Sequence, residues 1–280
     1  MSPDYAIHSD FLIHWTGKDL DAQYDPDWYV SNKSSIEGNS ELCQAYVDRL
    51  YNIIKYGLWL TEEPEIQLQA GHPNAVIPST PKVCFTELKL SESRNHARRY
   101  GRLGIGVKRS YLFDRFGRPV AYFGFHIAIN KDPFLRACAA DFRDKQLLNF
   151  FKPMNSGSTL NYDLYSESEW RILFSPELLA QRDQRLLIDP HDNLNTEEHS
   201  FLKSLSLPEQ KKLKYLAPLD GWFALIIYPS LGVKNKAQQE DSARIRHEIA
   251  RIKSNPNDHG NKVEGGNWPM EIDLDACRNF

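Results

Sequence analysis

The segment of residues 81–107 holds the largest group of side chains in this chain that could support chemistry. An apolar, strand-like run ends at Thr86, and cations such as Arg98 and Arg99 follow it, with Tyr100 beside them. Bare glycine backbone and clustered cations can both approach a phosphate, and a tyrosine can stack on a planar ring. The segment therefore predicts an anion site. A solvated basic helix between two strands is the alternative interpretation.

A second group lies at the end of the first apolar run, where His14 and Thr16 are two residues apart. A histidine at a strand end can donate or accept a hydrogen bond at a fixed position, near the threonine hydroxyl. This spacing fits a ligand contact. It fits equally well a core histidine that is bonded to a backbone carbonyl.

A third group, Glu167-Ser168-Glu169-Trp170-Arg171, leads into an apolar strand. Residues two apart point to the same side of an extended segment, so Glu167 and Glu169 share a face. A carboxylate at the rim of a cleft can stabilise a developing oxocarbenium cation electrostatically. Arg171 lies on that face too, so a simple ion pair with Glu169 is the alternative.

The elements that must position these groups follow from apolar periodicity and turn residues. Residues 40–56 predict the clearest helix, with Ser40 as its cap and Gly57 at its end. Strands and helices do not alternate strictly, which favours a mixed α+β domain over a doubly wound parallel sheet. Further strands are expected at residues 10–15, 58–60, 105–107, 120–129, 170–174, 222–228 and 270–274, with helices at 132–151, 197–207 and 238–253.

Composition limits the classes of function. The chain has 280 residues, a net charge of −3 and 41% hydrophobic residues, so it can bury a large core and has no global field for nucleic acid or membrane. We expect a single α+β domain over residues 1–280, with a mobile loop near residues 255–267, where apolar residues are scarce.

The four cysteines are scattered without zinc spacing, which predicts no metal site and fits a reducing, cytoplasmic setting. The N-terminus has no signal-peptide pattern, and no apolar stretch approaches the roughly 20 residues that span a bilayer. We therefore expect no membrane association.

These motifs resemble the AbiGi-type abortive phage-resistance proteins, which implies a role in phage defence. The resemblance covers residues 10–175 by motif. The matching residues are His14 and Thr16, then Tyr56-Gly57-Leu58, residues 81–91 with His96, residues 100–107, Pro119-Val120 with Tyr122, and residues 167–171.

The order of elements is more distantly similar to ADP-ribosyltransferases of the DarT kind. That similarity implies a split mixed sheet with flanking helices, and NAD as a substrate bent in a cleft. His14 would bind the adenosine-side ribose, with Thr16 beside it. Glu169 would stabilise the oxocarbenium ion and orient the acceptor. The remaining NAD contacts implied are Thr86 and Tyr100 around the nicotinamide, and Arg98 or Arg99 at the pyrophosphate.

Three functions remain open. The first is an ADP-ribosyltransferase-like effector with a nucleic acid or protein acceptor. The second is a non-catalytic antitoxin, immunity or nucleic-acid-binding component that holds a cognate toxin or a phage component. The third is a metal-free nuclease that uses His96, Arg98 or Arg99 with Glu87, although no spacing favours it.

Overall fold

The computed structural model describes residues 11–24, 36, 38–67, 76–87, 90–123, 143–153, 167–181, 184–192, 194–239 and 242–279. The chain divides into two compact units. Unit 1 is residues 1–58, 85–114 and 218–280, and unit 2 is residues 59–84 and 115–217. Both units combine helices with hydrogen-bonded strands, so the α+β expectation is confirmed at this level.

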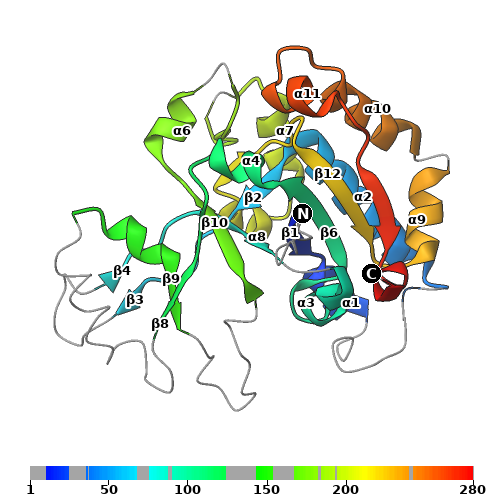
Figure 1. Ribbon diagram of the computed structural model, residues 1–280, viewed down its shortest axis with the longest axis horizontal. Coiled ribbons are helices and arrows are strands. Elements are labelled where there is room, and N and C mark those ends of the chain that lie inside the picture. The colour runs from blue at the N-terminus through cyan, green and yellow to red at the C-terminus, as the bar shows by residue number, and fades with distance from the viewer. Residues whose placement is uncertain are drawn as a thin grey trace, which may run out of the picture. The chain divides into compact units, whose positions relative to one another are not determined.

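Unit 1 carries a mixed sheet in the order β13-β12-β6-β1-β5. Strand β6 pairs antiparallel with both β1 and β12, whereas β13 pairs parallel with β12 (Figure 1). The elements of this unit are β1 (Phe11–Thr16), α1 (Lys18–Tyr24), α2 (Ser40–Tyr56), the end of β5 (Lys82–Thr86), η1 (Leu90–Glu92), α3 (Ser93–Tyr100), β6 (Leu103–Lys108), α4 (Arg109–Phe113), β12 (Phe223–Tyr228), α9 (Leu231–Gln238), α10 (Ser242–Lys253), α11 (His259–Glu264), β13 (Met270–Asp273) and η5 (Ala276–Asn279).

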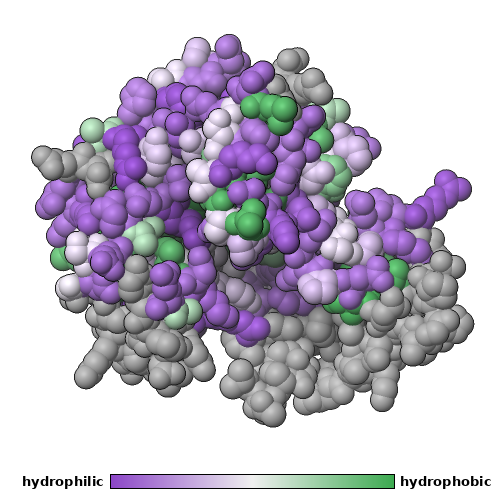
Figure 2. Space-filling view, turned by 180° about the vertical axis from the view of Figure 1, so that it is seen from behind, coloured by the Kyte–Doolittle hydropathy of each residue, from purple (hydrophilic) through white to green (hydrophobic). Residues whose placement is uncertain are grey.

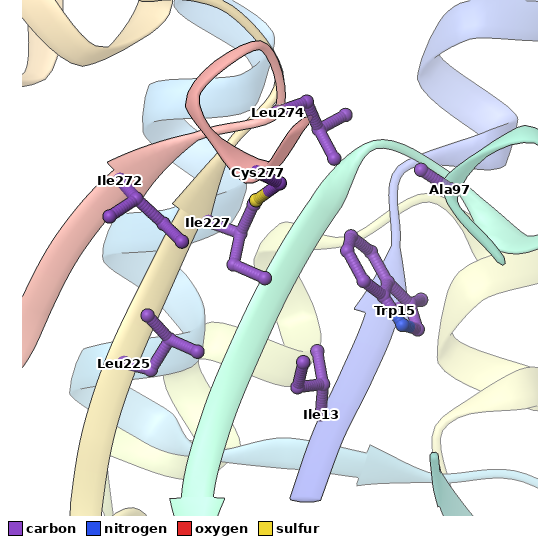
Figure 3. Close-up of a cluster of buried hydrophobic side chains, with 8 residues drawn as sticks. All are labelled: Ile13, Trp15, Ala97, Leu225, Ile227, Ile272, Leu274 and Cys277. Atoms are coloured by element: carbon purple, nitrogen blue, oxygen red, sulfur yellow. The ribbon is translucent and has the colours of Figure 1, made fainter. Parts of the chain in front are cut away.

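One face of this sheet is closed by a hydrophobic cluster that joins segments distant in the chain (Figure 3). Strand β6 places Gly104 and Gly106 beneath this cluster. A Cβ on Gly106 would lie 2.6 Å from Cβ of Leu225, and one on Gly104 would lie 3.1 Å from Cβ of Ile227. The bare strand thus lets the neighbouring side chains fill the space above it. The cluster consists of Ile13, Trp15, Ala97, Leu225, Ile227, Ile272, Leu274 and Cys277.

Helix α2 confirms the predicted helix, with one change at its start. The cap is Asn39 rather than Ser40: the Asn39 side chain accepts a hydrogen bond of 3.0 Å from the backbone N–H of Leu42. Ser40 is instead the first helical residue. At the other end, Gly57 has φ 115°, a value that favours glycine, although its ψ of 177° is not that of a left-handed helical cap.

Strand β13 forms an edge of the unit 1 sheet, as expected for a final strand. Nζ of Lys234 on α9 donates a 3.0 Å hydrogen bond to the backbone carbonyl of Glu271 in this strand. The Glu271 carboxylate in turn accepts hydrogen bonds from Tyr228, Gln238 and Trp268. Both the backbone and the side chain at the centre of the edge strand are therefore engaged.

Unit 2 carries the strand order β5-β10-β7. Strand β5 belongs to unit 2 as far as Cys84, and its last two residues belong to unit 1. Three two-stranded pairs, β11-β2, β3-β4 and β8-β9, complete its strands. Its elements are β2 (Leu58–Leu60), β3 (Ile66–Gln67), β4 (Val76–Ile77), β7 (Arg118–Pro119), β8 (Ala121–Phe123), η3 (Lys145–Phe150), β9 (Phe151–Pro153), β10 (Glu169–Leu173), α6 (Pro176–Ala180), α7 (Glu197–Ser204), α8 (Leu207–Lys212) and β11 (Tyr215–Ala217).

Several expected elements differ from those observed. Residues 259–264, expected within a loop, form α11. The expected helix of residues 238–253 corresponds to α10, which begins at Ser242, whereas Gln238 ends α9. Residues 132–142 of another expected helix lie outside the described residues, and its described end is the 3₁₀ helix η3.

The surface carries no dominant apolar region in the view of Figure 2. Hydrophilic residues cover most of the coloured surface there, and hydrophobic residues form small groups. Within the described ranges, no helix combines the length and apolar character needed to cross a bilayer.

Candidate functional site

The predicted site residues fall into both units. Glu169 belongs to unit 2. The others all belong to unit 1: His14, Thr16, Thr86, Arg98, Arg99 and Tyr100. Two local constellations can therefore be built from the structure, one around β1 and α3 in unit 1 and one around β10 in unit 2.

The register of the unit 1 sheet separates the predicted NAD contacts onto two faces. Ile13 on β1 is directly opposite Thr86 on β5, so their side chains share a face. His14 and Thr16 alternate with Ile13 along β1 and therefore lie on the other face. Thr86 is buried, whereas His14 and Thr16 are half-buried. The structure brings His14 and Thr16 together and does not place Thr86 with them.

His14 has an aromatic neighbour on its own face, because its imidazole meets the Phe85 ring edge-on at 5.9 Å between ring centroids. At the strand end, Nη1 of Arg49 on α2 donates to Oγ1 of Thr16 at 3.4 Å. Arg49 also binds Asp19 through both terminal nitrogens, at 3.2 and 2.6 Å. The end of β1 in unit 1 thus carries the half-buried imidazole of His14 and the hydroxyl of Thr16, with the guanidinium of Arg49 bonded to that hydroxyl.

The turn after β1 is fixed by buried polar contacts. The hydroxyl of Tyr46 donates to the carboxylate of Asp21 at 2.6 Å, and Arg102 pairs with the same carboxylate at 3.3 Å. Burial and the neighbouring Asp21 raise the pKa of Tyr46 well above its ordinary value, so the phenol stays a donor. Gly101 packs so closely that a Cβ there would lie 2.2 Å from the backbone oxygen of Thr16. The position of Thr16 is therefore set by α2 and by the residues that end α3.

The basic segment folds as α3, a helix between two strands, which is the alternative that the sequence left open. Acidic residues distant in the chain pair with several of its cations, so less positive charge is available than the sequence suggests. Arg94 of α3 pairs with Asp275, and two cations that follow the helix are also paired, Arg102 with Asp21 and Arg109 of α4 with Glu87.

The other predicted residues of α3 divide between surface and core. Arg98 is exposed, and the Arg99 guanidinium lies over the Tyr100 ring, 5.5 Å from its centroid. Tyr100 itself packs against the hydrophobic cluster, on the face opposite His14. His96 is buried, with its ring 6.0 Å from that of Tyr100. The burial of His96 and the pairing of Glu87 with Arg109 give the nuclease interpretation no support.

In unit 2, Glu169 is the centre of a buried ionic cluster. Nε of Arg171 donates to Oε1 of Glu169 at 2.6 Å, and Nη2 donates to Oε2 at 3.1 Å. The pair that the sequence offered as the alternative reading of this motif is therefore present. Another guanidinium nitrogen of Arg171 donates to the backbone carbonyl of Asn149. Arg171 is thus fixed from two sides and holds the carboxylate in one orientation.

The short β8-β9 pair binds the same carboxylate from another direction. Tyr122 and Lys152 are directly opposite each other in this pair, so they share a face. The Tyr122 hydroxyl accepts a 2.9 Å hydrogen bond from the backbone N–H of Glu169. Nζ of Lys152 binds Oε2 of Glu169 at 2.6 Å and also the carboxylate of Glu167. Glu167 and Glu169 therefore share one ammonium group.

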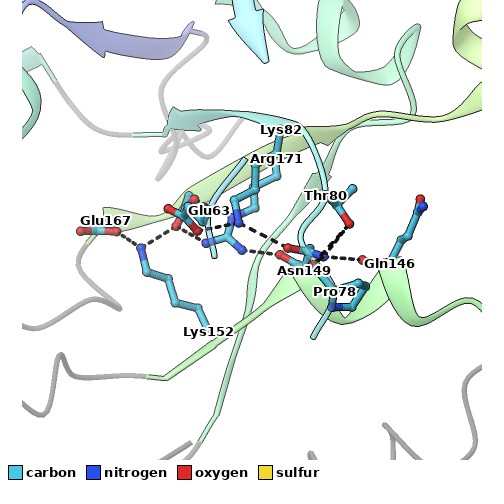
Figure 4. Close-up of polar contacts among 10 residues, drawn as sticks. Glu63, Pro78, Thr80, Lys82, Gln146, Asn149, Lys152, Glu167 and Arg171 are labelled. Carbon is cyan, nitrogen blue, oxygen red and sulfur yellow. Dashed lines mark hydrogen bonds and ion pairs between the residues drawn. The ribbon is translucent and has the colours of Figure 1, made fainter. Parts of the chain in front are cut away.

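The cluster continues through a second lysine and an amide (Figure 4). Nζ of Lys82 on β5 binds Glu63 at 2.6 Å and donates to Oδ1 of Asn149 at 3.3 Å. The Asn149 amide nitrogen donates to Oγ1 of Thr80 at 3.1 Å. Three carboxylates and three cations thus balance each other within a few ångströms.

Electrostatics keep Glu169, Lys152 and Arg171 in their charged forms. Burial alone would raise the pKa of Glu169, but Arg171 and Lys152 lower it to about 2. Burial would likewise lower the pKa of Lys152 and of Arg171, but the adjacent carboxylates raise both above their ordinary values. Cys84 nearby is the opposite case, because burial and Glu169 raise the pKa of its thiol. The carboxylate is permanently ionised and the thiol permanently protonated near neutral pH.

Sequence reasoning missed several charged residues of the two constellations. Lys152, which binds Glu169, falls in a segment expected to be a loop. Glu63, which binds Lys82, falls in a polar, proline-containing stretch, and Arg49, which binds Thr16, is one of the polar positions of a helix. None of these has a local pattern. Only Lys82 had a signal, since a lysine at the start of the apolar run of β5 is costly to bury without a partner.

The arrangement can hold an ionised carboxylate in a fixed position. Within the described residues, no three histidine, cysteine or acidic side chains gather in a way that could hold a metal ion.

Comparison of this chain with known proteins finds no relative. Neither a protein-family model, a curated protein sequence nor a solved structure matches this chain.

Proposed function

We propose that this protein is an ADP-ribosyltransferase-like effector of phage defence that transfers ADP-ribose from NAD to a nucleic acid or protein. Glu169 is the carboxylate that stabilises the oxocarbenium ion. His14 and Thr16 are the residues that contact NAD in unit 1.

The observation that carries the proposal is the state of Glu169. The carboxylate stands at the start of a strand, two residues after a second glutamate, and its pKa is about 2. An electrostatic stabiliser of a developing cation must be ionised and held in place before the reaction, because the reorganisation of a charge during the reaction is costly. Arg171 and Tyr122 supply that fixed position.

Support for NAD contact in unit 1 comes from the corner at the end of β1. His14 and Thr16 share a face there, both are half-buried, and the guanidinium of Arg49 is bonded to the threonine hydroxyl. These groups can hydrogen-bond ribose hydroxyls and attract a phosphate. Thr86 is buried on the opposite face of the sheet. We therefore propose that NAD contacts the face that carries His14 and Thr16, and not Thr86.

The reaction breaks the bond between C1′ of the ribose and the nicotinamide nitrogen. Nicotinamide leaves with the bonding electron pair as a neutral molecule. The oxocarbenium ion that remains bonds to an acceptor oxygen or nitrogen, which loses its proton to solvent. Water can act as the acceptor, so nicotinamide release can be measured without knowing the natural target.

Binding is tested by thermal shift of the purified protein with NAD. A ligand at about 100 times its dissociation constant stabilises the folded state by about 2.7 kcal/mol, which gives a readily measured rise in melting temperature. His14→Ala should reduce the shift, whereas the matched control His247→Ala, an exposed histidine on α10, should keep it. The absence of any NAD-dependent shift in the wild type would remove the basis for NAD recognition.

Chemistry is tested with two substitutions of the central carboxylate. Glu169→Gln removes the charge, and Glu169→Asp keeps the charge for Arg171 but draws it back by one methylene. Both should lower nicotinamide release by about 100-fold or more, since removing one preorganised electrostatic group typically has that effect. Glu177→Gln, an exposed glutamate of the same unit, should act like the wild type. Unchanged release by a folded Glu169→Asp protein would refute the role of Glu169.

A further inference from the structure

We propose that Lys152 is an electrostatic latch: its ammonium group neutralises the carboxylates of Glu167 and Glu169 and keeps the transferase in a low-activity state. This inference rests on the proposed function, because it takes Glu169 as the stabilising carboxylate. Activation then consists of withdrawing the ammonium group of this lysine from both carboxylates.

The contacts show why Lys152 silences the carboxylate. Oε2 of Glu169 meets Nζ of Lys152 at 2.6 Å, while Arg171 covers both carboxylate oxygens. The two carboxylates and two cations of this group sum to zero. A neutral group attracts a developing oxocarbenium ion only through its dipoles, whereas a group with one excess negative charge attracts it directly.

Lys152 is the member of the group that can leave. Its side chain is 18% exposed, against 8% for the side chain of Arg171, the other cation of the group. It comes from β9, a strand of three residues, whereas Arg171 lies within β10 and is also bonded to the carbonyl of Asn149. The most solvated cation is thus the one on the shorter strand.

Removing Lys152 leaves Glu169 in position. Arg171 keeps its two bonds to the carboxylate, and Tyr122 still accepts from the backbone N–H of Glu169. The main change is in charge, because both carboxylates lose the ammonium group while Glu169 keeps the guanidinium of Arg171. The direction of the rate change distinguishes a latch from a positioning residue. Removing a positioning residue lowers the rate of the reaction, whereas removing a latch raises it.

The experiment compares nicotinamide release from NAD by the purified full chain and by Lys152→Met. We expect the variant to release nicotinamide about tenfold faster or more, as one neutralising charge is removed beside the reacting centre. Lys152→Gln, which keeps a donor but no charge, should do the same and guards against a packing fault in the methionine variant. Lys214→Met, which breaks a half-exposed lysine–glutamate pair of the same unit, should not change the rate.

The outcomes separate the two proposals. If the wild type releases nicotinamide and both Lys152 variants, folded by circular dichroism, are no faster, the latch is refuted and the proposed function stands. If none of the proteins releases nicotinamide and NAD gives no thermal shift, the proposed function fails and the latch fails with it. A rate gain that disappears in the Lys152→Met, Glu169→Gln double variant shows that the gain acts through Glu169.

Discussion

Gly101 offers the sharpest test of how unit 1 fixes the end of β1. This residue follows α3 with φ 116° and ψ 160°, a backbone region that is essentially restricted to glycine. A Cβ there would lie 2.2 Å from the backbone oxygen of Thr16 and 2.3 Å from the backbone nitrogen of Lys18. Both neighbours are main-chain atoms, so no side chain can rotate away to relieve the overlap.

Gly265 provides the matched control. It also has a positive φ, 67°, but a Cβ at this position meets nothing within 4 Å. Gly265→Ala should therefore cost only the conformational strain, about 1 kcal/mol of unfolding free energy. Gly101→Ala adds the backbone overlap to a strain of about 1–3 kcal/mol, so we expect a loss of about 4 kcal/mol.

Urea unfolding followed by circular dichroism measures both variants against the wild type. The loss at Gly101 should exceed the loss at Gly265 by about 3 kcal/mol, because the backbone overlap adds to the larger conformational strain at Gly101. Equal losses at the two positions would mean that the contact between α3 and the turn after β1 is not tight, and the account of how Thr16 is positioned would be wrong.

Three further predictions concern stability. The pKa of Glu169 is about 2 in the folded protein and 4.5 in an unperturbed glutamate, so the stabilisation by its ionised form is complete above pH ~4.5 and is lost as the pH falls through ~2. The loss is at most about 3 kcal/mol, and urea titrations across this range that show a flat unfolding free energy would contradict it. Asn39→Ala should lower the unfolding free energy by about 1 kcal/mol, whereas Ser40→Ala should change it little, and a reversed order would reject the observed cap. Gly106→Ala should cost about 1–3 kcal/mol because its Cβ would overlap Leu225, and a thermal melt matching the wild type would show that the strand contact is loose.

Elements with strong apolar patterns could be predicted from the sequence. The stripe along α2 and the apolar runs of β1, β10 and β12 correspond to observed elements within a residue or two at most ends. The start of α2 was misplaced by one residue, since Asn39 and Ser40 are both good caps and only the local backbone selects one.

Helix α11 could not be predicted from apolar periodicity, because polar hydrogen bonds and a glycine contact stabilise it instead. The Asp258 side chain caps it by accepting from the backbone N–H of Asn261 at 3.2 Å. The Asn261 amide donates to the carbonyl of Ile252 at 2.6 Å, and Gly260 packs against the backbone of Gly221. Polar caps and a glycine contact leave no hydrophobic signal in the sequence.

The candidate site was predicted less well than the fold. The pair of Glu169 and Arg171 follows from alternation along one strand, so it could be anticipated. Lys152 and Arg49 reach their partners only through tertiary structure, and nothing in their local sequence marks them. The separation of His14 from Thr86 follows from a one-residue register that the sequence does not specify.

Lys234 affects how strand β13, at the edge of the unit 1 sheet, can pair with strands of other molecules in the cell. An outer strand with free carbonyls invites a strand from another molecule, and such pairing can propagate into aggregates. Here an ammonium group already occupies the carbonyl of Glu271 and places a positive charge where an incoming backbone would align. This border is thus less open to self-association at the position of Glu271.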